Sequence, residues 1–206
     1  GEMQFGDHAI TTQFGDVIIL HLDKNGNWTW ATSIGGDSHD FAEEISVIGN
    51  SIVVTAKTVS STYFNFGNSN YSLSSASNED ERFVGGINIM NGNILWSANL
   101  SASSGASWYA PDLLTDSEGN TYLVGNLNGE LYLYNESKGI QSYVLKFAPD
   151  GSLLWNQSLS SNSSISPDVA NVMFDENEDL VIQLYAAGEM QFGDHAITTQ
   201  FGDVII

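Results

Sequence analysis

Residues 25–34 read NGNWTWATSI, and the same pattern returns as NGNILWSANL at residues 91–100 and as DGSLLWNQSL at residues 150–159. Each stretch places an Asn-Gly or Asp-Gly pair shortly before a tryptophan. Such pairs between alternating apolar residues are the strongest short-range signal for a β-hairpin, because type I′ turns need positive φ at both central residues. The three stretches therefore predict three related hairpins.

A longer repeat encloses these hairpins. Residues 1–19, GEMQFGDHAITTQFGDVII, recur letter for letter at residues 188–206, an offset of 187 residues. Shared amphipathic patterning fixes the class of a residue but not its identity, so this is a true internal repeat. Trp30, Trp96 and Trp155 are 66 and 59 residues apart, and the period closes after a further 62. Three units of about 62 residues thus make up each long period.

Each unit reads as four short strands joined by tight turns. We expect the units to cover residues 16–81, 82–140 and 141–203. No segment shows a helical apolar period of sufficient length, and repeated four-stranded antiparallel units are the sequence form of a β-propeller. The sequence predicts an all-β chain of about three propeller blades, an incomplete ring unless it is continued or assembled with other copies. The predicted turns lie at residues 23–27, 49–50, 91–93, 116–120, 149–151 and 175–179.

Composition limits the partners of the chain. Of its 206 residues, 42% are hydrophobic and 11% aromatic, which is ample for a packed core. There are 25 acidic residues against 5 Lys and Arg, and the formal charge of −20 repels nucleic acid and anionic lipid. Cysteine is absent, and no apolar run is as long as a membrane span. We expect an exported or cell-surface prokaryotic protein that neither binds nucleic acid nor inserts into a membrane.

The motifs resemble those of SBBP, a family of bacterial and archaeal β-propeller repeats. Its blades combine a Phe-Val strand leading to a Gly-Asn turn and a Trp, a Gly-Gly to Asp segment, a second Gly-Asn turn before Tyr-Val, and a Phe-Gly segment. Two departures are Ser101–Ser104 in place of Gly-Gly and Asp179 in place of a Gly-Asn turn. The resemblance implies a propeller in a large exported or surface-anchored protein, usually with a binding or structural role. The similar stretches are Phe83–Trp96, Gly35–Phe41, Leu114–Gly125 and Phe5–Asp16.

Three predicted turns carry oxygen-bearing side chains at alternate positions, the spacing with which short calcium loops begin. None of them has the downstream bidentate Glu of such loops, and Asp and Asn are also the ordinary residues of tight turns. We take the first of the three sets below as a candidate calcium site, with a plain turn as the alternative. The sets are Asp175, Asn177 and Asp179; Asp116, Glu118 and Asn120; and Asp23, Asn25 and Asn27.

The remaining polar residues show no catalytic signature. His39 lies in the run DSHD of residues 37–40, but adjacent loop residues point in different directions and do not form a triad. Glu43 and Glu44 have no identifiable partner for glycoside cleavage. Residues 91–96 also resemble the docking motif of quinoprotein propellers, and in both resemblances we expect Trp96 to be buried. We predict no catalytic residue and no cofactor other than the candidate calcium.

These observations suggest three functions. The first is a non-enzymatic structural or adhesive module of a large, repetitive exported or surface protein, whose identical copies self-associate head to tail into a filament or array. The second is a lectin-like propeller that binds surface glycans or another ligand through exposed aromatic residues such as Trp108, Tyr109 and Tyr132. The third is a quinoprotein-like propeller enzyme.

Overall fold

The computed structural model describes residues 1–12, 14–59, 63–66, 69–72, 80–103, 105–109, 111–134, 136–162, 167–192 and 194–205. All regular elements among these residues are β-strands, paired in small antiparallel sheets, so the predicted all-β class is confirmed. The described residues contain no helix that could cross a membrane. The chain divides into two compact units, Gly1–Ser101 and Ala102–Ile206.

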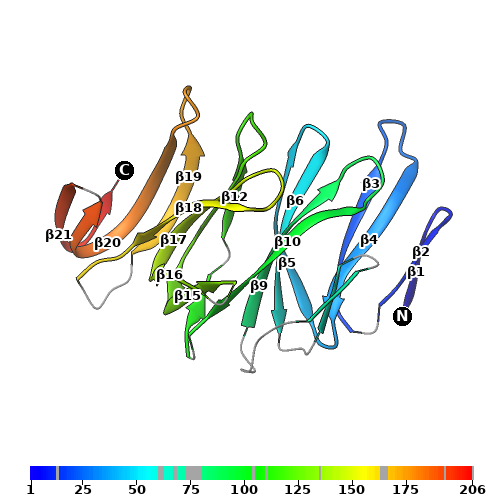
Figure 1. The fold of residues 1–206 in the computed structure, drawn as a ribbon, viewed down its shortest axis with the longest axis horizontal. Coiled ribbons are helices and arrows are strands. Elements are labelled where there is room, and N and C mark those ends of the chain that lie inside the picture. Colours follow the sequence, from blue (N-terminus) through cyan, green and yellow to red (C-terminus); the bar gives the residue numbers. More distant parts are fainter. Residues whose placement is uncertain are drawn as a thin grey trace. The chain divides into compact units, whose positions relative to one another are not determined.

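Unit 1 consists of antiparallel hairpins (Figure 1). Strands β1 and β2 form one hairpin, and β2 lies against β4. Strands β3, β4, β7 and β8 form a four-stranded sheet in that order, whereas β10, β9, β6 and β5 are hydrogen-bonded neighbours in that order. The bounds are β1 (Glu2–Phe5), β2 (His8–Thr11), β3 (Val17–Leu22), β4 (Trp28–Gly36), β5 (Asp40–Ile48), β6 (Ser51–Val59), β7 (Tyr63–Phe66), β8 (Ser69–Ser72), β9 (Asp80–Asn88) and β10 (Ile94–Ala102).

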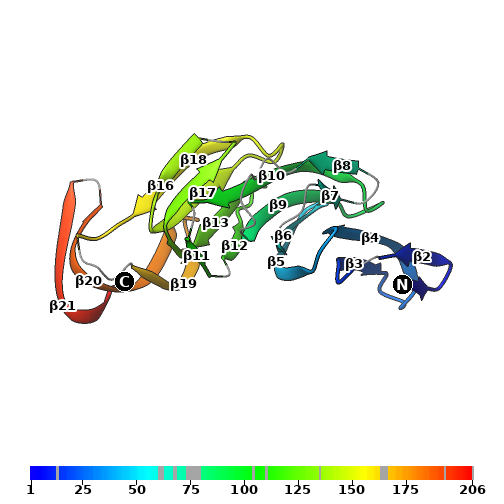
Figure 2. The same ribbon diagram turned by 90° about the horizontal axis from the view of Figure 1, so that it is seen from below.

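Unit 2 has a four-stranded sheet in the order β12-β13-β17-β18 and a three-stranded sheet in the order β19-β20-β21. The long strands β20 and β21 run beside each other at the red end of the chain in Figure 2. Strands β11 and β14 form a two-stranded sheet, and β15 and β16 are a further pair of hydrogen-bonded neighbours. The bounds are β11 (Ser107–Trp108), β12 (Asp112–Thr115), β13 (Thr121–Gly125), β14 (Leu127–Asn128), β15 (Glu130–Leu133), β16 (Glu136–Ile140), β17 (Ser142–Phe147), β18 (Leu153–Leu159), β19 (Asp168–Phe174), β20 (Leu180–Phe192) and β21 (His195–Ile205).

Every predicted turn joins two paired strands. The turns at 23–27, 91–93 and 149–151 connect β3 to β4, β9 to β10 and β17 to β18. Gly26 (φ +85°) and Gly151 (φ +84°) occupy the left-handed region, which glycine enters without steric cost. The local turn chemistry therefore decides where each hairpin forms.

Some strands pair across the boundaries of the expected repeats of about 62 residues, the first of which contained the segments of β3 to β6. In the structure β6 pairs with β9 from Ser51↔Asn88 to Val59↔Asp80, across the expected boundary after residue 81. Similarly, β13 pairs with β17 across the boundary after residue 140, while the free edge of β4 is taken by β7. A turn fixes one hairpin, but which hairpins become neighbours depends on packing between residues far apart in sequence.

The core of unit 1 is formed by the inward faces of β3, β4, β6 and β9. Trp30 is buried there, and its Nε1–H donates to the carbonyl oxygen of Ile89 at 2.7 Å. The His21 ring stacks on the indole with centroids 5.3 Å apart. Gly92 lies so close that a Cβ there would be 2.7 Å from Cε3 of Trp30. This tryptophan therefore ties the β3-β4 hairpin to the β9-β10 turn.

The other two repeated tryptophans differ in burial. Trp96 is buried against Gly86, as predicted, and a Cβ on Gly86 would collide with its indole Nε1. Trp155 is 39% exposed and contacts the edge of Tyr122, with ring centroids 5.9 Å apart. The repeated sequence phrase thus leads to a buried or to a half-exposed indole, depending on the neighbouring strands. Unit 2 has its own core cluster of Val124, Val144, Leu159, Leu184, Ala186 and Met190.

Candidate functional site

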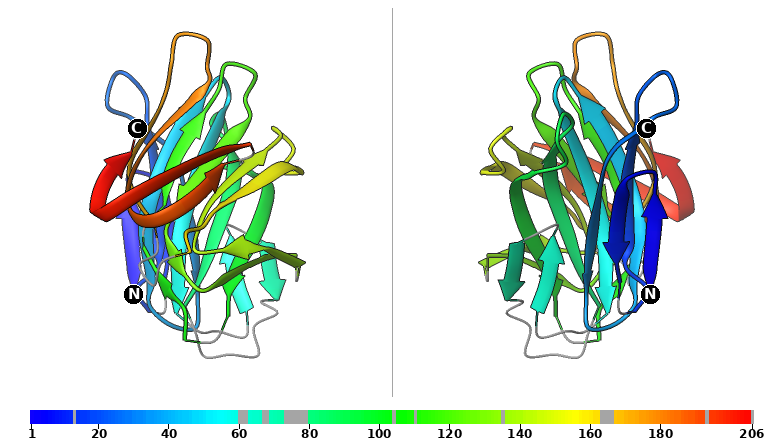
Figure 3. Two further views of the ribbon diagram at one scale, coloured as in Figure 1. Left: turned by 90° about the vertical axis from the view of Figure 1, so that its left-hand side faces the viewer. Right: turned by 90° about the vertical axis from the view of Figure 1, so that its right-hand side faces the viewer.

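The 19-residue repeat forms the same hairpin in both of its copies. In unit 1 the pairs run from Glu2↔Thr11 to Phe5↔His8. In unit 2 the corresponding pairs run from Glu189↔Thr198 to Phe192↔His195, each displaced by the 187-residue period. The right-hand view of Figure 3 shows the first hairpin in dark blue, and the left-hand view shows the second in orange and red. The repeated sequence therefore specifies its local structure, including the register.

The two copies differ in the strand beside them. In the first copy, the strand that follows the hairpin pairs with β4, with Val17 opposite Ile34. In the second copy, the identical residue Val204 belongs to β21, the second strand of the hairpin, and extends the hairpin ladder opposite Tyr185 of β20. One sequence thus pairs with two different strands of the same chain. Because a strand has two hydrogen-bonding edges, we take this repeat as the candidate interaction site.

The three Asp-containing turns share one backbone geometry. In each, the N–H of the first residue donates to the carbonyl of the fifth, and the N–H of the fourth donates to the carbonyl of the first. Oδ1 of Asp23, Asp116 and Asp175 accepts two backbone N–H groups from within its own turn. In this arrangement, the carboxylate closes the turn and satisfies its backbone donors.

Calcium binding at Asp175, Asn177 and Asp179 stays a prediction. Hydrogen bonds from Asp179 N and Asn177 N lower the pKa of Asp175, so its carboxylate is charged at neutral pH. Within the described ranges no group of three or more His, Cys, Asp or Glu side chains is arranged to hold a metal ion. Melting of the wild type and of Asp175→Asn, with calcium and with chelator, tests the site. A calcium-dependent rise that Asp175→Asn removes is the expected result; an unchanged midpoint removes the proposal.

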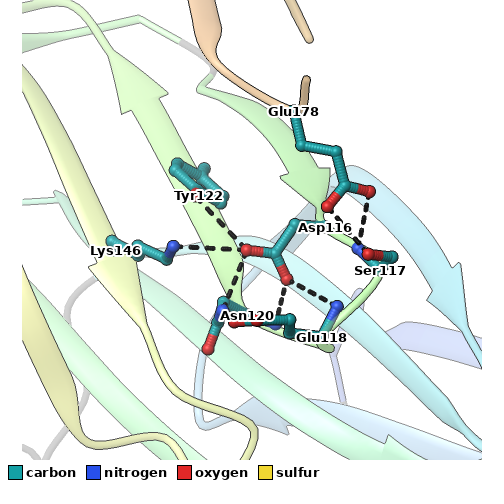
Figure 4. A network of polar contacts seen from close by, with 7 residues as sticks. All are labelled: Asp116, Ser117, Glu118, Asn120, Tyr122, Lys146 and Glu178. Atoms are coloured by element: carbon teal, nitrogen blue, oxygen red, sulfur yellow. Dashed lines mark hydrogen bonds and ion pairs between the residues drawn. The ribbon is translucent and has the colours of Figure 1, made fainter. Parts of the chain in front are cut away.

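Asp116 differs from its counterparts because it is buried in a polar network (Figure 4). Its Oδ2 accepts hydrogen bonds from Asn120 Nδ2 at 2.8 Å and from the Tyr122 hydroxyl at 3.3 Å, and forms an ion pair with Lys146 Nζ at 3.2 Å. The ammonium group also lies 4.6 Å from the centroid of the Tyr122 ring. Burial alone would raise the pKa of Asp116, but the hydrogen bonds from Asn120 and Lys146 outweigh it and lower the pKa.

Glu178 links two of these turns within unit 2. Its carboxylate accepts the backbone N–H of Ser117 at 3.0 Å and the Ser117 hydroxyl at 2.7 Å. Glu178 has φ +62°, a region that non-glycine residues rarely adopt, and it occupies the turn position that Gly26 and Gly119 fill elsewhere. The contact with the neighbouring turn accounts for a charged residue in that strained place.

A group of carboxylates that the sequence did not single out surrounds the Gly35-Gly36 pair of unit 1. Asp40 is buried, and its Oδ2 accepts the backbone N–H of Gly36 at 3.0 Å. Burial raises the pKa of Asp40 to about 6, and the nearby charges of Asp16 and Asp37 act in the same direction. Burial also raises the pKa of Asp16. Because the pKa values of these carboxyl groups are raised, the stability of unit 1 should change between pH 7 and pH 5.

We expect unit 1 to become more stable as the pH falls from 7 to 5. Because the pKa of Asp40 is higher in the folded chain, its stabilising contribution is fully present below the unfolded pKa and is lost as the pH rises through about 6. The gain is about 1 kcal/mol. Urea unfolding of the wild type and of Asp40→Asn at both pH values measures it. An equal pH response in the two proteins would exclude Asp40 as the cause.

Of the other residues weighed for catalysis, Glu43 and His39 have side-chain contacts, whereas Glu44 donates its backbone N–H to Thr55 Oγ1 at 3.0 Å. Glu43 forms a buried ion pair with Arg82, with Oε1 and Nε 2.8 Å apart. Burial raises the pKa of Glu43, against the opposing effect of Arg82. The imidazole of His39 lies against Gly15, where a Cβ would be 2.7 Å from Nδ1. These contacts hold β5 to β9 and the β4-β5 connection to the end of the repeat.

The aromatic residues proposed for ligand binding also lie in separate contacts. Trp108 packs edge-on against Tyr143 with centroids 6.2 Å apart, whereas Tyr109 is exposed. Tyr132 donates its hydroxyl hydrogen to Glu130 Oε2 at 2.7 Å. Of the three residues, Tyr109 offers the most accessible ring.

A polar groove of about 610 Å³ lies in unit 1 between β2, β4 and the β9-β10 turn. Its residues come from three segments that are far apart in sequence, so the groove could not be predicted from the sequence alone. Its lining is Ala9, Ile10, Thr11, Ala31, Thr32, Ser33, Asn91, Gly92, Asn93 and Ile94.

No protein-family model matches the chain, and comparison with curated proteins finds no match.

Proposed function

We propose that the chain is a non-enzymatic structural or adhesive module, a β-propeller segment whose identical copies assemble head to tail in an exported or cell-surface protein. The observation that carries this proposal is the repeat. The same 19 residues contain the same hairpin twice, and residues near their C-terminal end pair with β4 in one copy and with β20 in the other. A segment with two different strand partners is suited to connect neighbouring copies.

The sheets support the propeller part of the proposal. Antiparallel hairpins recur along the chain. In the hairpins β3-β4, β9-β10 and β17-β18, the repeated sequence forms the turn and the tryptophan-containing second strand. The resemblance to SBBP repeats points to the same architecture. The formal charge of −20 suits a surface protein in a medium whose salt screens self-repulsion.

Sedimentation velocity of the chain over a wide concentration range tests the proposed assembly. We expect species larger than the 22.3 kDa monomer that grow with concentration, because heterologous contacts between identical copies form rings or filaments. Electron microscopy then separates a closed ring from a filament. A single monomeric species at every concentration would contradict head-to-tail assembly.

Glycan binding is a second candidate function, favoured by the polar groove of unit 1. Thr11, Thr32, Ser33, Asn91 and Asn93 are among its lining residues, and hydroxyl and amide groups exchange hydrogen bonds with sugar hydroxyls. Screening against a glycan array, with Thr32→Val as the groove variant, tests this function. A signal that Thr32→Val weakens would support it, and a flat response would remove it.

A further inference from the structure

The hairpin of the repeat carries one apolar face that is only partly covered in each copy. Met3 is opposite Ile10 in the first copy, and Met190 is opposite Ile197 in the second. Directly opposite residues of an antiparallel pair point to the same side of the sheet. The methionine and the isoleucine therefore share one face, and a partner must cover both of them to bury it.

The two copies bury opposite halves of this face. In the first copy Met3 is 37% exposed and Ile10 only 8%. In the second copy the order is reversed, with Met190 at 0% and Ile197 at 38%. Because the two sequences are identical, the difference arises from the surroundings of each hairpin and not from the hairpin itself.

The elements that cover each half belong to this chain. Met190 packs into the core cluster of unit 2 and bridges to Ser161. Asn162 adds two hydrogen bonds to the backbone of Glu189, at 3.0 and 2.9 Å. In the first copy, by contrast, β2 lies against β4, and Phe5 packs edge-on against Trp28 with centroids 5.6 Å apart. Unit 2 thus supplies the cover for the methionine half, and unit 1 supplies it for the isoleucine half.

We propose that one copy of the repeat joins two chains, with its methionine half packed on unit 2 of one chain and its isoleucine half packed on unit 1 of the next. The strand after the hairpin then pairs with β20 on one edge and with β4 of the next chain on the other. This inference rests on the proposed assembly and names its contact surface. The partner is a second copy of this chain, because this chain contains both covering surfaces.

Joining two chains is a strand exchange. Each chain holds two repeat segments, but one junction uses a single segment, so a segment from one chain must displace its identical counterpart from the other. The displaced segment is tethered next to its site at a high effective concentration, and it competes strongly with an incoming one. A substitution that weakens the resident segment should therefore promote exchange.

A fluorescent peptide with the sequence GEMQFGDHAITTQFGDVII measures this exchange directly. The target is the full chain carrying Ile10→Glu, which weakens the resident segment beside β4. We expect the peptide to bind this variant at least about tenfold more tightly than the wild type, because its tethered competitor is weakened. A peptide with Glu in place of its tenth residue should not show this gain. The proposal would be overturned if the two peptides bound the Ile10→Glu chain equally well. It would also be overturned if the wild-type peptide bound the wild-type and Ile10→Glu chains equally well.

A pair of chain variants guards against simple misfolding of Ile10→Glu. Ile10→Glu alone retains an intact second repeat and should associate more strongly than the wild type. Ile10→Glu combined with Ile197→Glu has the same change at β4 but lacks a competent donor, so it should remain monomeric. Similar association of the two variants would mean nonspecific aggregation and would contradict the exchange.

The two proposals fail in different ways. If the wild-type chain assembles but neither Ile10→Glu nor Ile197→Glu alters the assembly, the proposed function stands and this contact surface is wrong. If the peptide binds the Ile10→Glu chain while the wild-type chain stays monomeric at every concentration, the repeat is exchangeable but the proposed assembly fails.

Discussion

Trp30→Ala is expected to cost about 3–5 kcal/mol of unfolding free energy. The substitution removes a buried indole from the core of unit 1, breaks its hydrogen bond to Ile89 and leaves a cavity beside Gly92. The cost combines the lost transfer free energy with the cavity, because the surrounding strands relax only partly. Denaturation followed by circular dichroism measures it without relying on tryptophan fluorescence.

Trp155→Ala is the matched control for this experiment. Trp155 occupies the same place in its own repeated phrase but is 39% exposed. We expect a smaller loss of about 1–2 kcal/mol. Trp30→Phe should fall between the two alanine variants, since it keeps most of the packing but lacks the donor for Ile89. Equal losses at Trp30 and Trp155 would contradict the role assigned to the buried ring.

Asp116→Ala is expected to have the second-largest effect, a loss of about 2–3 kcal/mol. The carboxylate accepts hydrogen bonds from Asn120 and the Tyr122 hydroxyl and pairs with Lys146 in a buried place. Its removal leaves the Lys146 ammonium and the Tyr122 hydroxyl without this acceptor, whereas the Asn120 amide keeps its hydrogen bond to Glu118. Buried polar groups that lose a partner are costly. Urea unfolding at neutral pH and low salt measures the loss.

Asp23→Ala provides the matched control in unit 1. Asp23 closes a turn of the same backbone geometry with the same Oδ1 contacts, but the turn is exposed to solvent. Water can replace those contacts, so the loss should be much smaller than at Asp116. If the two substitutions cost the same, the turn itself and not the network around Lys146 would account for the stability.

The sequence was sufficient to locate the hairpins because turn chemistry acts locally. An Asn-Gly or Asp-Gly pair has few alternatives to a turn, and the turns at 23–27, 91–93 and 149–151 formed as expected. Grouping the hairpins required non-local information. Nothing within the sequence of β6 indicates that one of its partners is β9.

The candidate sites were predictable to the same extent. The repeat was evident from identity alone, but its two half-covered faces depend on β4 and on the core of unit 2. The turns of Asp23, Asp116 and Asp175 read alike, whereas only Asp116 among them is buried and meets a lysine. In the sequence, Asp40 is notable only as part of the run DSHD that contains His39. Its raised pKa comes from burial, which the sequence does not reveal.

Disulfide crosslinking of two cysteine-variant chains by a mild added oxidant tests the central claim most directly. The wild-type chain has no cysteine, and Ser161 is the bridge partner of Met190, the counterpart of Met3. Paired residues of neighbouring strands lie within the range of a disulfide. A mixture of Ser161→Cys and Met3→Cys chains should therefore form a mixed disulfide dimer, and do so much faster than Ser161→Cys with Met90→Cys, whose methionine is exposed in the β9-β10 turn. Equal rates in the two mixtures would contradict the account.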